Sequence, residues 1–565
     1  MRRQRRSSAL LALLMVFGLA AAACSSSSKT STGSGSSSSS SVAVPKGGTL
    51  IVGAEQEPDC MDWIGSCSGS SWGYWMVAVQ TMPRAFDVIK DSSGNYNYVP
   101  NSMLTGEPKL ETTPVQKVTY TINPKAVWSD GVPITSTDFK YTWDQIANGT
   151  DVYDKTGYNL IDSVDDSKPD TAVVTFKSGQ SYGDWKGLFT GNYGIFPSHI
   201  LQGQDRDAAM KDGYKFSAGP WMLDSWTKTD NITLVPNPKY WGTPPSLDKV
   251  IFKIQADTSA EFTAFKSNQV SMIYPQPQLD AVDQINAGIP DTQKVISTDT
   301  ASFEALWMNM GIAPFNDPAV RKAVAYAIDR QAIVKRLFGG LGVTEPLQDI
   351  NAPIVAQFTD SQAYAQYTLD LKKVDSILTG DGYVKGSDGM YAKNGQPLTI
   401  TVRTTAGNKR RETTQQILQD ELKSAGIGMT IDNLKASDLF GKALPTGDFQ
   451  SAIYAQNLTT LQASTCNIFC SQNSSPIGQS GGNNYTRTNV GAVDTPLTKM
   501  DGELDTSQLT AEGKQASQAS ADNVISLPID PLPAILLWQN KVVGPIDDNG
   551  VLGPFWNINL WGVTG

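Results

Sequence analysis

The sequence predicts an α/β protein of two or more lobes. Residues 398–402 have the pattern of a strand, residues 412–425 that of an amphipathic helix and residues 427–431 that of a second strand, with Gly426 placed to end the helix. Strands that alternate with helices favour α/β lobes with largely parallel pairing. The chain has 565 residues, 40% of them hydrophobic, which is more than one core usually holds.

Other elements have recognisable boundaries. Residues 117–122 alternate as a strand, and a turn at residues 129–131 leads to Thr135, which can cap a helix with Asp138 three positions on. The sequence therefore predicts a helix that begins just after Thr135.

Two successive helices are predicted after residue 316. Asp317 is a capping residue, and Pro318 stands at the first helical position. Asp329 caps the next helix, which ends at the glycines of residues 339–340. No internal repeat accompanies these elements.

The N-terminus predicts export. Four arginines occur in the first six residues, an apolar run covers residues 9–23, and alanines precede Cys24. The run is short of the roughly 20 residues that a spanning helix needs, so residues 1–23 are predicted to be a signal peptide. The string LAAAAC at residues 19–24 resembles the bacterial lipoprotein signal, although Ala21 stands where a bulky aliphatic residue is usual. The resemblance implies a lipid on Cys24; ordinary secretion is the alternative.

A tether is predicted to follow. Residues 25–41 are almost all Ser, Thr and Gly, and such segments behave as flexible coils. About 17 residues reach roughly 20 to 25 Å. Residues 24–47 are therefore predicted to hold a globular body just off a membrane.

Charge argues against nucleic acid as a partner. Without residues 1–23, which carry four of the 45 basic residues and none of the 55 acidic ones, the chain has 41 basic and 55 acidic residues, a net charge of −14. Such a surface repels phosphate backbones.

The cysteines agree with export. A lipidated Cys24 leaves four cysteines, which are Cys60, Cys67, Cys466 and Cys470. An even number in an oxidising compartment favours two disulfides. Three pairing schemes are possible, and the close spacings favour Cys60 with Cys67 and Cys466 with Cys470. Free buried thiols are the alternative. Because His199 is the only histidine, no metal site is predicted.

The chain lacks the motifs of an enzyme. It contains no GxSxG, HExxH or P-loop sequence, and a single histidine disfavours a Ser-His-Asp triad. We therefore expect no catalytic residues and no cofactor, and a secreted hydrolase is the least favoured class.

Four ordered stretches carry a family resemblance. They are VWSDGVPITSTDFKYTW (127–143), AGPWMLDSW (218–226), NPKYWGTPPSLDKVIF (237–252) and PFNDPAVRKAVAYAIDR (314–330). In order and spacing they resemble family 5 of the extracytoplasmic solute-binding proteins, which serve peptide and nickel ABC importers. The resemblance runs from about residue 48 to the C-terminus.

The motif residues themselves are expected to be architectural. Trp128 should be buried beside a tight turn, and residues 237–241 should form a turn that ends in anchoring aromatics. His199 is expected to pack and not to bind a ligand. The scarcity of histidine argues against the nickel branch.

The resemblance implies a two-lobed periplasmic-binding-protein fold (type II, cluster C) with an extra subdomain on the first lobe. Lobe I would take residues 48–82, 204–300 and 523–565, its subdomain residues 83–203, and lobe II residues 301–522. A Cys60–Cys466 disulfide would tie the lobes together, which again favours the local pairings.

The same resemblance implies how such a protein works. It would be a monomer, anchored by lipid to the outer face of the cytoplasmic membrane, that closes on a short peptide or another small solute and passes it to ABC permease subunits.

The resemblance also places the ligand between two segments. They are the loop after the first strand, with Ser68, Ser70, Trp72 and Trp75, and a strand late in lobe II, with Tyr454, Gln456, Asn457 and Thr459. Backbone groups of the loop could pair with an extended peptide as an added strand. The alternative is a surface loop with both tryptophans in the core.

The second segment departs from the family pattern. Dipeptide and oligopeptide binders have an aspartate there that pairs with the ligand's amino group, whereas residues 454–460 contain no carboxylate. Loss of a charge-assisted partner weakens selection for a free N-terminus. Blocked or modified peptides, siderophore-like compounds, oligosaccharides, an acidic partner elsewhere in the chain, and a role as a ligand sensor therefore stay open.

Overall fold

The structure is a computed structural model that describes residues 44–65, 67, 71–191, 194–458, 461, 465–480 and 482–564. The predicted signal peptide, Cys24 and most of the predicted tether lie outside these residues. Among the helices of the described part, none is long and apolar enough to cross a membrane.

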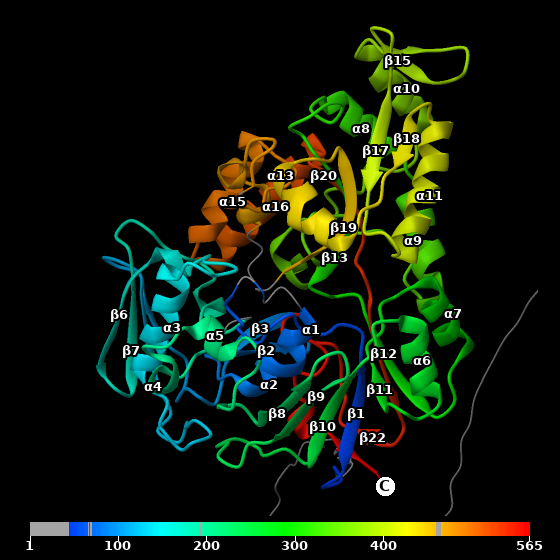
Figure 1. The fold of residues 1–565 in the computed structure, drawn as a ribbon. Coiled ribbons are helices and arrows are strands. Elements are labelled where there is room, and N and C mark those ends of the chain that lie inside the picture. Colours follow the sequence, from blue (N-terminus) through cyan, green and yellow to red (C-terminus); the bar gives the residue numbers. More distant parts are fainter. Residues whose placement is uncertain are drawn as a thin grey trace, which may run out of the picture. The chain divides into compact units, whose positions relative to one another are not determined.

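A seven-stranded sheet organises one part of the molecule. Its strand order is β12-β21-β11-β1-β10-β9-β8 (Figure 1). The strands are β1 (Thr49–Ala54), β8 (Trp221–Thr227), β9 (Asn231–Pro236), β10 (Lys249–Ile254), β11 (Met272–Ile273), β12 (Thr292–Ser297) and β21 (Ala534–Gln539). Helices α6 (Thr258–Lys266) and α7 (Leu279–Ala287) belong to the same part, and Phe262 and Phe265 of α6 pack with Ile535 and Leu537 of β21.

A five-stranded sheet organises the second part, in the order β18-β17-β19-β13-β20. The strands are β13 (Ser302–Met308), β17 (Thr399–Arg403), β18 (Gly428–Ile431), β19 (Ser451–Asn457) and β20 (Ser526–Asp530). The longer helices around it are α8 (Pro318–Tyr326), α9 (Arg330–Phe338), α10 (Leu371–Gly380), α11 (Lys409–Ser424), α15 (Gly491–Gly502) and α16 (Thr506–Asn523).

Short elements complete this second part. They are η4 (Gly339–Leu341), η5 (Pro353–Phe358), α12 (Ala436–Asp438), η6 (Leu439–Ala443), α13 (Leu444–Thr446), α14 (Cys466–Phe469), η7 (Ser471–Asn473) and the small sheet of β14 (Val384–Lys385), β15 (Tyr391–Lys393) and β16 (Gln396–Pro397).

The segment predicted to be a subdomain has an antiparallel sheet of its own, β4-β5-β7-β6. Its elements are β2 (Phe86–Lys90), β3 (Tyr96–Pro100), β4 (Lys109–Glu111), β5 (Lys117–Thr121), α3 (Ser136–Asn148), η2 (Tyr158–Leu160), β6 (Ile161–Lys168), β7 (Thr171–Phe176), η3 (Trp185–Gly187) and α4 (Ser198–Leu201). Helix α3 packs on β6 and β7. The remaining described elements are α1 (Ser71–Gly73), η1 (Tyr74–Ala78), α2 (Val79–Thr81), α5 (Arg206–Met210), β22 (Val542–Val543), η8 (Ile558–Leu560) and β23 (Gly562–Val563).

The prediction of largely parallel sheets is wrong. Strand β1 is parallel to β10 and β11, and β17 is parallel to β18 and β19, but every other pairing between the named strands is antiparallel. A helical crossover such as α11 forces a parallel return, whereas β8 and β9 are joined by a short turn and β10 follows without an intervening helix. The predicted strand–helix–strand unit is correct, but it is not representative of either sheet.

Predicted helix starts are confirmed. Thr135 and Asp138 form a capping box at α3, and Asp317 and Asp329 accept backbone N–H groups at the starts of α8 and α9. Gly426 has φ +84° after α11. That helix begins three residues earlier than predicted because the side chain of Asn408 caps it.

Several residues of the family motifs have structural roles, as expected. The indole of Trp128 is fully buried and donates to Asp138. Arg321 donates to the carbonyls of Phe315 and Asn523, and Arg330 to those of Leu347, Pro528, Tyr364 and Tyr367. Buried guanidinium groups thus satisfy loop carbonyls in the motif of residues 314–330.

Two segments join the sheets. Residues 298–301 lead from β12 to β13, and residues 531–533 lead from β20 to β21. The Thr300 hydroxyl lies 3.5 Å from the carbonyl oxygen of Pro531 and 3.2 Å from that of Leu532, which holds the segments side by side. Because β20 pairs with β13, we propose that the return to lobe I begins after Asp530 instead of at residue 523.

A buried charge cluster lies where these segments enter the five-stranded sheet. The carboxylate of Glu304 accepts from Arg410 at 3.0 Å and from Arg411 at 2.6 Å, and all three residues are at most 9% exposed. Burial alone would raise the pKa of Glu304, but the two guanidinium groups outweigh it and hold that pKa below its usual value. Burial and the neighbouring Glu304 charge raise the pKa of Asp530 to about 7.

Removing the charge of Glu304 should destabilise the fold. In Glu304→Gln two buried guanidinium groups lose their counter-charge, and we expect the free energy of unfolding at pH 7 to fall by about 3 kcal/mol. The control is Glu412→Gln on α11, whose partner Lys409 is 77% exposed and whose loss should cost less than about 1 kcal/mol. Denaturation with guanidinium chloride measures the free energy of unfolding of both variants. Equal decreases would contradict a central role for the cluster.

Candidate functional site

The first predicted ligand segment is helical from Ser71 onward. Elements α1, η1 and α2 form one continuous stretch to Thr81, with Trp72, Met76 and Val79 buried at helical spacing. The expectation of an open loop that could add a strand is therefore wrong for this part. Backbone groups inside a helix bond to each other and are not available to a peptide.

An aromatic group surrounds this helical stretch. Trp72 is 2% exposed, and its ring centroid lies 5.9 to 6.0 Å from those of Trp75, Tyr274 and Phe555. Trp72 is therefore a packing residue in this structure, which is the alternative weighed for it. Trp75 stays partly exposed and meets Tyr274 edge-on at 5.6 Å.

A glycine makes room for Trp75. Gly553 has φ +80°, and an ideal Cβ on it would lie 2.1 Å from Cδ1 of Trp75, far inside contact distance. The partly exposed indole is thus fixed by a residue near the C-terminus.

The second predicted segment is strand β19. Its first four residues are buried, Ala455 and Gln456 are partly exposed, and Asn457 is exposed. Strand β13 pairs with β19 along its whole length, but β17 pairs only with Ser451 and Ala452. Within the described part of the chain, the second half of β19 therefore has one edge without a partner strand.

Tyr454 is held from both sides. Trp307 stacks on its ring at 5.0 Å and donates to its carbonyl at 2.8 Å. Phe440, 41% exposed, meets it edge-on at 5.8 Å. Trp75 and Phe440 each lie in a short π-helix, η1 and η6, and such rare turns are frequent at functional sites.

Asn457 faces Ser302 across the pair of strands. The Ser302 hydroxyl hydrogen-bonds one end of the Asn457 amide, and the other end has no partner among the described residues. The side chain of Asn457 is therefore an uncharged amide with one of its two ends hydrogen-bonded among the described residues.

The C-terminal segment lies between the two predicted regions. Gly553 packs on Trp75, and an ideal Cβ on Gly550 would lie 3.3 Å from the backbone nitrogen of Ala301, the residue before Ser302. Residues 549–553 therefore contact Trp75 at one end and the backbone next to Ser302 at the other, and so they link the two predicted regions.

One carboxyl group lies beside the aromatic group. Asp548 is 5% exposed, and the Tyr274 hydroxyl hydrogen-bonds its side chain. Burial raises the pKa of Asp548 to about 7, and the nearby Asp547 and Asp299 contribute. Near neutral pH this acid is a weak source of negative charge for a ligand.

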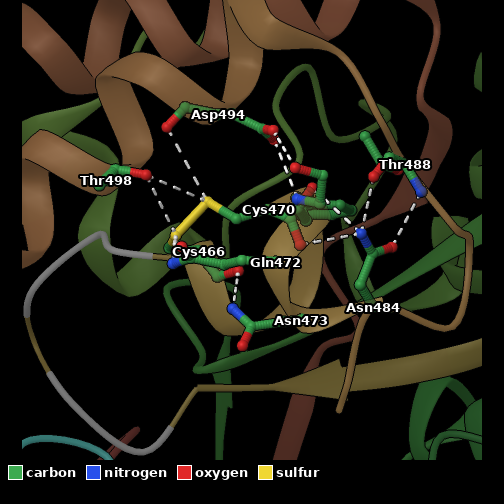
Figure 2. Close-up of a disulfide and its surroundings, with 10 residues drawn as sticks. Cys466, Cys470, Gln472, Asn473, Asn484, Thr488, Asp494 and Thr498 are labelled. Atoms are coloured by element: carbon green, nitrogen blue, oxygen red, sulfur yellow. Dashed lines mark hydrogen bonds between the residues drawn. A yellow bond between two sulfur atoms is a disulfide. The ribbon is translucent and has the colours of Figure 1, made fainter. Parts of the chain in front are cut away.

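Both local disulfides are present. Cys60 pairs with Cys67, with Cα atoms 5.9 Å apart, and Cys466 pairs with Cys470 at 4.7 Å. The second disulfide spans α14 in the segment that follows β19 (Figure 2).

Polar side chains hold the second disulfide in place. Asn484 donates to the carbonyls of Cys470 and Thr488, and Asn473 donates to that of Cys466 (Figure 2). Phe469 of α14 stacks on Trp307 at 6.0 Å. The disulfide turn therefore supports Tyr454 through the Trp307 ring.

His199 was expected to pack, but it is exposed, although it contacts two neighbouring side chains. Its Nε2 lies 2.9 Å from Asp130, and its ring is 6.2 Å from that of Trp128. Among the described residues, one acidic group has the spacing of a metal site: Asp62, Asp151 and Asp207. Arg206 already binds Asp62 at 2.8 Å, which provides the positive charge there.

The predicted site is only partly described. Ser68, Ser70 and Thr459 lie outside the described residues, as does Cys24. Sequence reasoning missed Phe440, Ser302 and Tyr274, since a lone Phe, Ser or Tyr far from the predicted segments carries no local signal of what it will face.

A two-lobed solute-binding protein is the class that these features define. The family model for bacterial extracellular solute-binding proteins, family 5 (middle), matches residues 108–474, and the chain belongs to this family. It is therefore an extracytoplasmic solute-binding protein of the kind that serves ABC peptide and nickel importers.

Named relatives are oligopeptide-binding proteins. OppA of Mycobacterium tuberculosis (strain ATCC 25618 / H37Rv) is 28% identical over 475 residues, 80% of this chain and 75% of that protein. AppA of Bacillus subtilis (strain 168) is 24% identical over 74% of each chain.

Solved structures share the fold. A periplasmic EDTA-binding protein, EppA, matches with a TM-score of 0.81 at 22% identity, over 92% of this chain and 97% of that one. AppA from Bacillus subtilis in complex with a nonapeptide matches with a TM-score of 0.74 at 20% identity, over 93% and 100%.

Proposed function

We propose that this protein is the substrate-binding subunit of an ABC importer and that it binds a short peptide, or a peptide-like solute, in extended form along the free edge of β19. It performs no chemistry on the solute and delivers it to permease subunits. The observation that carries the proposal is that the second half of β19 has, among the described residues, one edge without a partner strand, while Trp307 supports Tyr454 within it.

Several features support this mode of binding. An extended peptide can hydrogen-bond an open strand edge while its side chains occupy permissive pockets. Trp75 in the first predicted segment is partly exposed, and Phe440, which contacts Tyr454 of the second, is exposed, so both offer aromatic surface. The named relatives are oligopeptide-binding proteins, which favours peptides over other solutes.

The charge of the site bears on which peptides bind. The segment in which the family pattern has an aspartate, residues 454–460, contains no carboxylate, and Asp548 is buried with a raised pKa. The proposed site therefore makes no strong ion pair with a terminal ammonium group, and N-blocked or modified peptides fit as well as free ones.

Substitutions at the two proposed contacts should weaken binding. For the tightest binder from a library of tri- to nonapeptides, we expect Asn457→Ala to raise Kd about fivefold, the effect of one hydrogen bond, and Trp75→Ala to raise it about thirtyfold. Calorimetry gives the Kd values. Asn148→Ala and Trp241→Ala are the matched controls, because both residues lie in other parts of the chain; unchanged affinity in the Asn457 and Trp75 variants would move the site elsewhere.

A carboxylate introduced at residue 457 should create selection for a free N-terminus. We expect the wild type to bind a peptide and its N-acetylated form within about threefold of each other. Asn457→Asp should favour the free form by about tenfold, or ~1.4 kcal/mol, through a charge-assisted hydrogen bond. Asn148→Asp controls for net charge, and a wild type that already rejects acetylated peptides would show that another acid provides the pairing.

We also propose that Cys24 carries the lipid that holds the protein at the outer face of the membrane. Cys24→Ala should then appear in the medium, whereas Ser25→Ala should stay with the membrane fraction. Cell fractionation with metabolic labelling by a fatty acid measures both, and membrane retention of Cys24→Ala would refute the anchor.

A further inference from the structure

A loop of the predicted subdomain meets the end of a helix of lobe II. The hydroxyl of Ser181 donates to the carbonyl of Gly502 at 2.6 Å, and the N–H of Gly183 donates to the carbonyl of Asp501 at 2.8 Å. Ser181 and Gly183 lie in the loop between β7 and η3, and Asp501 and Gly502 are the last two residues of α15.

These hydrogen bonds complete the cap of α15. The last carbonyls of a helix have no partner inside the helix and need other donors. The carbonyl of Met500 accepts a hydrogen bond from the N–H of Glu503 at 3.3 Å. The next two carbonyls, those of Asp501 and Gly502, accept the hydrogen bonds from the loop. If the two parts separated, water would have to replace both donors.

The loop is held ready for this contact. Gln116, 2% exposed, accepts from the Tyr182 nitrogen at 2.7 Å and donates to the Tyr182 carbonyl at 3.0 Å. The Tyr182 ring is buried against Gly157, on which an ideal Cβ would lie 2.5 Å from that ring. Because the donors on either side of Tyr182 are already fixed, little conformational entropy is lost when they bond to α15.

A second contact joins the same two parts. The Tyr98 hydroxyl of β3 accepts from the backbone N–H of Leu461 at 3.1 Å. Leu461 follows β19, whereas Asp501 and Gly502 lie some 40 residues further along the chain. Two separate points of contact resist rotation better than one.

We propose that the loop of residues 181–184, pinned by Gln116, is a latch that holds the subdomain against lobe II in the absence of solute. In a two-lobed binding protein such a latch shifts the equilibrium between open and closed states toward closure and slows release of whatever solute is bound. The inference rests on the two-lobed class of the protein and on no particular solute.

The latch should respond to pH. Burial raises the pKa of Asp501 to about 7. The ionisable groups around the contact are Tyr182, Asp184 and Asp154 on the loop side, Lys499 and Glu503 near the end of α15, and Glu512 on α16. When the contact opens, Asp501 becomes solvated and its pKa returns toward the ordinary value, so closure takes up a proton. The latch is therefore most favoured below the ordinary carboxyl pKa of 3.8, weakens as the pH rises toward about 7, and is insensitive to pH above that because Asp501 is then ionised in both states.

Hydrogen exchange of the unliganded protein tests the latch directly. In Ser181→Ala, peptides that cover residues 181–184 and 499–503 should exchange about fivefold faster at pH 6, the effect of one hydrogen bond, and the radius of gyration in solution scattering should rise. Ser163→Ala, an exposed serine on β6 of the same subdomain, is the control and should change neither. Unchanged exchange in Ser181→Ala would overturn the proposal.

The variant Asp501→Asn tests whether the pH dependence of the latch comes from Asp501. After correction for intrinsic exchange rates, wild-type protection of these peptides should fall as the pH rises from about 5 to about 7 and then stay level, while protection in Asp501→Asn should stay constant throughout. Equal pH dependence in both proteins would remove Asp501 from the latch. If exchange rises over the whole chain of Ser181→Ala, the residue supports the fold in general and the latch is refuted, whatever the outcome of the peptide-binding experiments.

Discussion

The pairing of β13 with β19 on one side and β20 on the other is the interaction on which the rest of the structure depends. Strand β13 carries Glu304, which fixes the start of α11, and Trp307, which supports Tyr454 and the disulfide turn. Strand β20 carries the chain back toward the seven-stranded sheet. A single strand thus sets the position of the proposed binding edge, the buried charge cluster and the return crossing.

Local features of this fold could be predicted from sequence because they depend on neighbours in the chain. The caps at Thr135, Asp317 and Asp329 and the left-handed Gly426 follow from backbone chemistry over a few residues. One of the four family motifs has a structural role of this kind, since Arg321 and Arg330 satisfy loop carbonyls of this fold.

Non-local features could not be predicted in the same way. Much of the antiparallel pairing in both sheets joins strands more than 100 residues apart, such as β11 with β21, whose order no local pattern encodes. The helix at Trp72 and Trp75 was obscured by the Ser- and Gly-rich run before it, and its burial depends on Tyr274 and Phe555. Phe440 enters the site only because η6 lies against Tyr454, a contact visible in three dimensions alone.

The close fit of Gly553 against Trp75 has a practical meaning for anyone who produces this protein. The final twenty residues are not a dispensable tail, since Gly553 packs on Trp75 of the proposed site and β23 pairs with β22. A shortened clone, or proteolytic trimming during purification, would strip the indole of its neighbour some 480 positions away. Affinity tags and fluorescent reporters therefore belong beyond Thr564, behind a spacer.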